Sequence, residues 1–154
     1  MFKAGNILHG CFDLGPNGKK NKFAIILYND SVECIITTFA TSQPRSSVSN
    51  PVHGKNPQEG EPMSYVFKSN VSIGTKPLDH SEFSFRKDTT VVPDYGISES
   101  TISVFNTSVD NLEVICKLYD KEYSNLIYTL YRCKKTKKKY KQIFERILQE
   151  TEST

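Results

Sequence analysis

The apolar positions divide the chain into an N-terminal part with short apolar runs and a C-terminal part with helical spacing. Runs rich in β-branched and aromatic residues are typical of strands, because such side chains fit a pleated, half-buried surface. We therefore predict strands over residues 5–14, 22–29, 32–40, 63–69, 82–92 and 111–120, with 82–92 forming one bent strand or two. The second of these runs is apolar almost throughout, as a strand covered on both faces would be.

Helices are expected after residue 94. Residues 98–106 read as a short helix capped by Ser98 or Ser100, and Asp120 can cap a second helix. A third helix is expected to begin near Thr136. The second and third helices each carry five apolar or aromatic residues at 3- and 4-residue steps, which predicts that both dock on a core. These stripes are Tyr123, Leu126, Ile127, Leu130 and Tyr131, and then Tyr140, Ile143, Phe144, Ile147 and Leu148.

Short strands followed by helices predict the α+β class, as a small β-barrel with helices packed on it. The 154 residues fit one domain, in which residues 1–119 form the barrel with its short helix and 120–150 a helical extension. No apolar run reaches the roughly 18 residues of a membrane span, and the first residues lack a signal-peptide pattern. The four cysteines include no CxxC pair, so we predict a reducing cytoplasm.

The basic charge is concentrated in one segment. The net charge is +3, but residues 132–141 hold seven of the 20 basic residues and no acid, leaving 13 basic against 17 acidic residues elsewhere. Such a patch can contact phosphates or acidic partners, with Lys137 and Lys138 as candidates. The simpler interpretation is a solvated helix face.

The sequence lacks the motifs of several common kinds of site. The chain has no GxxxxGK[ST], GxGxxG or GxSxG pattern. His9, His53 and His80 lack metal-ligand spacing, and the i, i+2 pair of His9 and Cys11 is weak evidence for zinc. We therefore predict neither a metal nor a cofactor, while a Cys-His nucleophile pair stays open.

The second and third predicted strands bring candidate chemistry together. Lys19, Lys20 and Lys22 lie at and just before the start of the second strand, and the third closes with Thr37, Thr38, Thr41, Ser42 and Arg45. In an antiparallel pair joined by a tight turn, here at Asn29-Asp30, these two ends are neighbours. Cations can neutralise charge on a phosphate and hydroxyls can orient its oxygens. The alternative is structural, because threonine suits strands and lysine blunts strand edges.

The N-terminal third resembles the MazF/PemK-like toxins, endoribonucleases of bacterial toxin-antitoxin systems. The resemblance covers about residues 4–43 and lies in three pieces: GNILHGCFDL, the basic loop and strand GPNGKKNKFAIILYND, and IITTFATS. Residues 88–102 are similar to a later strand and short helix of the family. Lys22-Phe23 stands where the family usually has Arg-Pro, and Asn6 where it has Asp.

The resemblance implies an SH3-like barrel, usually a homodimer, that cleaves single-stranded RNA without a metal by attack of the ribose 2′-hydroxyl. By position, Lys22 replaces the catalytic arginine and Thr41 matches the catalytic threonine, with Ser42 beside it. The loop at residues 15–21, including Lys19 and Lys20, would flank the RNA and meet an antitoxin protein.

Arg45 lies near enough in sequence to supply a further cation. It belongs to residues 43–62, which hold four prolines and are long for a passive connection. Two other readings stay open. One is a non-catalytic SH3-like module that binds RNA or a protein, and the other is an unrelated structural or defence protein.

Overall fold

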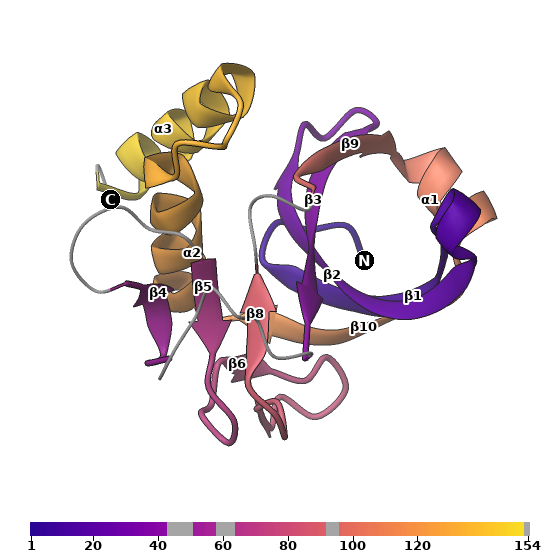
Figure 1. The fold of residues 1–154 in the computed structure, drawn as a ribbon, viewed down its shortest axis with the longest axis horizontal. Coiled ribbons are helices and arrows are strands. Elements are labelled where there is room, and N and C mark those ends of the chain that lie inside the picture. The colour runs from indigo at the N-terminus through magenta and orange to yellow at the C-terminus, as the bar shows by residue number, and fades with distance from the viewer. Residues whose placement is uncertain (43–50, 58–63, 92–95, 153–154) are drawn as a thin grey trace.

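The computed structural model describes residues 1–42, 51–57, 64–91 and 96–152 (Figure 1). Within them the chain forms an antiparallel sheet of ten strands with three α-helices, which confirms the predicted α+β class. The first elements are β1 (Asn6–Asp13), the 3-10 turn η1 (Gly15–Asn17), β2 (Lys19–Asn29), β3 (Cys34–Thr41), β4 (Gly54–Asn56) and β5 (Ser64–Phe67). They are followed by β6 (Gly74–Thr75), β7 (Glu82–Phe83), β8 (Thr89–Val91), β9 (Ser98–Thr101), α1 (Ile102–Ser108), β10 (Asp110–Leu118), α2 (Asp120–Arg132) and α3 (Lys138–Glu152).

The sheet follows the order β4-β5-β8-β3-β2-β1-β10-β6-β7, and β9 pairs with β3 outside this path. In the described residues the path stays open at β4 and β7, so the predicted closed barrel is not confirmed. The sheet also branches at β3, which has two neighbours on the same edge. Residues Cys34–Thr37 pair with β9, whereas Ala40 and Thr41 pair with β8. At one end β1, β2 and β3 form a ring together with β9 and α1, and at the other the sheet runs on through β8 and β5 (Figure 1).

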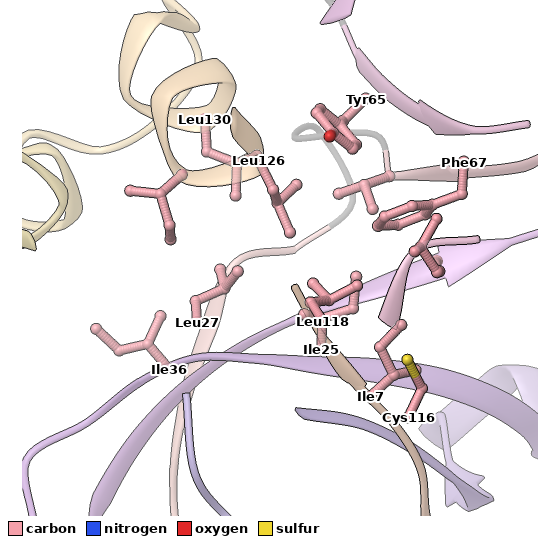
Figure 2. Close-up of a cluster of buried hydrophobic side chains, with 14 of the residues drawn as sticks. Ile7, Ile25, Leu27, Ile36, Tyr65, Phe67, Cys116, Leu118, Leu126 and Leu130 are labelled. Carbon is pink, nitrogen blue, oxygen red and sulfur yellow. The ribbon is translucent and has the colours of Figure 1, made fainter. Parts of the chain in front are cut away.

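The main core lies between the sheet and the two C-terminal helices. Ile25 and Leu27 of β2 face Leu126 and Leu130 of α2 (Figure 2), and all four side chains are fully buried. Helix α3 contributes Phe144, also fully buried. The predicted docking of both helical stripes is therefore confirmed.

A second core covers the opposite face of β1, β2 and β3. Ala24 and Ile26 alternate with the main-core residues of β2 and pack here with Phe105 of α1. Both faces of β2 are thus covered, which explains its nearly continuous apolar sequence. We call the face that carries this second core the inner face. Gly10 lies on it, and a Cβ there would come within 2.6 Å of Val109 Cγ1, so the close approach requires glycine.

Several boundaries differ from the prediction. Residues 98–101, expected to begin a helix, form β9 because they pair with β3, and Thr101 caps α1 by accepting a hydrogen bond from the Val104 N–H at 3.1 Å. Asp120 is the first residue of α2 and not its cap, which is Tyr119. Residues 82–91 hold two strands, β7 and β8, which is one of the two predicted alternatives. Strand β4 lies inside the segment 43–62, for which no strand was predicted.

Candidate functional site

The register of β2 and β3 places Lys22 beside Thr41. The two strands are antiparallel, with Phe23 opposite Ala40. Lys22 and Thr41 each lie one residue beyond this pair, on strands about 4.8 Å apart. The predicted meeting of the start of one strand with the end of the other is therefore confirmed for these two residues.

Both side chains belong to the inner face. They alternate with Phe23 and Ala40, which pack in the main core. Next to them in the sheet are Thr90 of β8, opposite Thr41, and Gly10 of β1, opposite Lys22. Because Gly10 has no side chain, no β1 side chain lies beside Lys22 at this position.

Lys20 and two aromatic rings extend this group. Lys20 lies two residues before Lys22, on the same face, and is paired with Phe12 of β1. The ring of Phe12 meets that of Phe39 edge-on, with centroids 5.0 Å apart. Lys20 is exposed, and Lys22 and Phe39 are half-buried. We call Lys20, Lys22, Phe39, Thr41 and Thr90 the inner-face site.

The cations of this site are not neutralised by the described part of the chain, in which neither Lys20 nor Lys22 makes an ion pair. Lys19 differs from them. It alternates to the opposite face, and its Nζ lies 3.6 Å from Asp110 Oδ2 in a pair whose side chains are both more than 60% exposed. Such a pair is weak, but it separates Lys19 from the inner-face site. The structure therefore brings together two of the three predicted lysines.

The remaining predicted site residues are Ser42, Arg45, Lys137 and Lys138. Ser42 follows Thr41 directly and is exposed. Arg45 lies outside the described residues, as does most of residues 43–62. Lys137 and Lys138 are exposed at the start of α3, next to Lys139, whose Nζ pairs with Glu99 Oε1 at 2.9 Å.

The start of α3 lies far from the inner-face site. Glu99 is opposite Ile36, five residues before Thr41 on β3, which corresponds to roughly 17 Å along the strand. Lys137 and Lys138 therefore do not join Lys22 and Thr41. Lys138 instead lines a hollow with other cations of the α2–α3 turn.

The sequence contains no indication of a partly buried polar cluster formed by His53, Tyr65 and Glu122. Glu122 Oε1 lies 2.8 Å from His53 Nε2 and accepts a hydrogen bond from the Tyr65 hydroxyl at 2.6 Å. The Lys68 N–H donates to His53 Nδ1 at 3.1 Å, so Nδ1 is an acceptor and Nε2 carries the proton given to Glu122. Burial, and then the hydrogen bond to Glu122, raises the pKa of Tyr65 far above its ordinary value.

This cluster has a structural role, because it holds separate elements of the fold together. Both ring nitrogens of His53 are engaged, so the ring has none left to take a proton from a substrate. The cluster links the β4–β5 hairpin to α2. Its members come from three separate segments, so no sequence motif could have indicated it.

The described residues give little support for a nucleophilic cysteine or for a metal site. Burial raises the pKa of Cys116 to about 12 and also raises that of Cys34, so neither thiol ionises readily. His9 packs against Phe23, with ring centroids 5.0 Å apart. Among the described side chains, no group of three or more His, Cys, Asp or Glu could hold a metal ion.

No helix in the described part of the chain is long and apolar enough to cross a membrane. Comparison of the chain with family models, curated proteins and solved structures found no match. Any function must therefore be argued from the residues and their geometry.

Proposed function

We propose that the chain is an RNA-binding protein of the MazF/PemK type that cleaves single-stranded RNA at the inner-face site. The observation that carries the proposal is the placement of Lys22 beside Thr41 on one face, with Lys20 next to them. Unneutralised cations beside hydroxyls are suited to a phosphodiester, because the cation offsets phosphate charge and hydroxyls bond its oxygens.

Each residue has a role in this proposal. The 2′-hydroxyl of the substrate attacks the adjacent phosphorus and forms a 2′,3′-cyclic phosphate as the bond to the 5′-oxygen breaks. The 2′-hydroxyl proton passes to solvent water, and water protonates the 5′-oxygen, which leaves with the downstream strand. Lys22 stabilises the charge that develops on the phosphoryl oxygens, and Thr41 orients the phosphate. The half-buried ring of Phe39 offers a surface on which a base can stack.

The proposal extends to the assembly. It also holds that the curled part of the sheet is an SH3-like barrel and that the protein forms a homodimer. Its partner would be an acidic antitoxin protein, and its location the cytoplasm. The curl of β1, β2 and β3 around the second core supports the barrel. Light scattering at several concentrations tests the homodimer, since a mass of 17.5 kDa at every concentration would contradict a dimer.

Single substitutions test the chemistry. Removing one preorganised donor to a developing oxyanion costs about 100- to 1,000-fold in rate, and we expect that loss for Lys22→Ala and for Thr41→Ala. Lys22→Arg should hold or raise the rate, because the guanidinium grips a phosphate at two points. Lys19→Ala is the matched control, because Lys19 is on the same strand but faces away.

The substrate supplies two further controls. A single deoxyribose at the cleavage position removes the nucleophile and should block cutting, whereas a chelator should leave the activity in place. Equal rates for Lys22→Ala and Lys19→Ala would place the site elsewhere.

A non-catalytic RNA-binding module is the second candidate, and one observation favours it. The residues that pair with Lys22 and Thr41, or alternate with them along the described strands, are Gly10, Lys20, Ala24, Phe39 and Thr90, and none of these carries a carboxylate or an imidazole to act as general base. In that case wild-type protein binds single-stranded RNA without cutting it, and Lys22→Ala weakens the binding. Anisotropy with an RNA oligonucleotide, read beside a cleavage gel, separates the two candidates.

A further inference from the structure

The turn between α2 and α3 borders a shallow, solvent-open basic hollow. Its volume is about 520 Å³, and it lies between the last turn of α2 and the first turns of α3. Four cations and one carboxylate contribute to its wall. The lining residues are Tyr131, Arg132, Lys134, Lys138, Lys141, Gln142 and Glu145.

The backbone that carries these side chains is held firmly. Thr136 is buried in the turn, where its hydroxyl donates to the Leu130 carbonyl at 2.7 Å. Tyr140 and Phe144 fix the start of α3 to the main core. The fold thus sets the backbone positions from which the cationic side chains extend, so the chain around them need not be ordered when a ligand binds.

The charges at the start of α3 are arranged against the helix dipole. Its first turn has lysines and no acid, although the N-terminal end of a helix favours negative charge. Glu99 neutralises Lys139, but Arg132, Lys138 and Lys141 make no ion pair within the described residues. Arg132 sits at the C-terminal end of α2, where a cation is favourable, so the unfavourable part is the pair Lys138 and Lys141. An anion in the hollow would relieve it.

The aromatic side chain in the wall of the hollow indicates which class of anion would bind there. Tyr131 lines the same hollow and is half-buried, because its side chain also packs against the main core. A ring next to several cations suits a nucleotide, whose base stacks while its phosphate pairs with Lys or Arg. The volume lies within the range of small-ligand sites, about 300 to 1,000 Å³.

We propose that the basic hollow binds a nucleotide phosphate, belonging either to an RNA strand or to a free nucleotide. Lys138 and Lys141 contact the phosphate, Arg132 assists, and Tyr131 stacks on the base. The inference does not depend on cleavage at Lys22 and Thr41, which lie near the far end of β3.

Binding measurements on two matched double variants test it. The probes are a fluorescent 2′-O-methyl oligouridylate, which has no free 2′-hydroxyl to attack, and uridine monophosphate. Lys138→Gln with Lys141→Gln is compared with Lys117→Gln and Lys121→Gln, an equal loss of charge outside the hollow. Thermal melting checks that both variants stay folded.

The first pair should weaken oligonucleotide binding at least tenfold and flatten its salt dependence, while the second pair leaves both near wild type. Each lost phosphate contact on a single strand lowers the slope of log K against log salt by about 0.7, so two contacts give about 1.4. If uridine monophosphate loses affinity in the same variant by the same factor, the ligand is a free nucleotide; if only the oligonucleotide does, the ligand is a strand.

Tyr131→Leu is an independent test, and we expect it to lower the affinity for the oligonucleotide about tenfold, the contribution of one stacked base. Equal weakening by both lysine pairs would overturn the site, because the cations would then act only through total charge. The nucleotide assignment would also fail if oligoglutamate competed as well as the oligonucleotide and Tyr131→Leu had no effect, since the hollow would then hold an acidic protein segment.

Discussion

Replacing Glu122 by alanine should destabilise the protein through the polar cluster with His53 and Tyr65. Glu122 Oε1 receives a hydrogen bond from each partner, and its side chain is only 13% exposed. Hydrogen bonds to a charged group contribute about 1.5 to 3 kcal/mol each, and a buried hydroxyl left without a partner costs about 1 to 3 kcal/mol. Tyr65 is 1% exposed and would incur the second cost, whereas water reaches His53, which is 28% exposed.

We therefore expect Glu122→Ala to lower the free energy of unfolding by about 3 kcal/mol, which at about 2 to 4 °C per kcal/mol lowers the Tm by about 6 to 12 °C. Glu122→Gln keeps an acceptor oxygen and removes the charge, so its loss should be about 1 kcal/mol. The neighbouring and exposed Lys121→Ala serves as control, with a change within about 0.5 kcal/mol.

Urea unfolding followed by circular dichroism measures these differences. A double-mutant cycle with Tyr65→Phe checks the cause, since Glu122→Ala should cost less when the hydroxyl is already absent. The reasoning would be refuted if Glu122→Ala cost no more than Lys121→Ala, or if the two substitutions were additive.

Three further predictions concern packing and pH. Phe144→Ala should cost about 3 to 5 kcal/mol in urea unfolding, because the ring is fully buried in the main core; a loss below about 1 kcal/mol would mean that α3 does not pack as described. Gly10→Ala should cost about 1 to 3 kcal/mol through contact with Val109, and Val109→Ala in the same chain should recover part of it. Burial, with a smaller contribution from Glu150, raises the pKa of Tyr123 to about 12. The unfolded chain ionises Tyr near about pH 10, so stability should fall as pH rises from there towards 12, and Tyr123→Phe should flatten that fall in chemical unfolding.

The elements with strong periodic patterns were predicted from the sequence, and those set by pairing were not. β1, β2, α2 and α3 fall close to the predicted ranges, because each carries enough apolar residues to define its own period. Residues 98–101, SEST, show no strand pattern of their own. They are a strand only because the first half of β3 is available to pair with them.

The candidate sites divide in the same way. The sequence predicted that the start of β2 and the end of β3 are neighbours. That Lys22 lies beside Thr41 depends on a longer connection, residues 30–33, and on a register shift between Ile26 and Tyr28, neither of which the tight turn predicted at Asn29-Asp30 would give. The sequence also showed that residues 132–141 concentrate positive charge. It could not show that Lys19 points away, that Lys139 is paired with Glu99, or that Lys138 and Lys141 share a hollow with Tyr131.

Only the tertiary structure decided how distant segments meet. His53 and Tyr65 lie 69 and 57 residues from Glu122 in the chain, yet they share one carboxylate oxygen. Strand β3 also pairs with both β9 and β8 along one edge, a branch that no local pattern indicates. Periodicity and turn residues act over a few positions, so the sequence determines elements and hairpins. Contacts between elements depend on which buried surfaces pack best together, and that is decided by the whole chain at once.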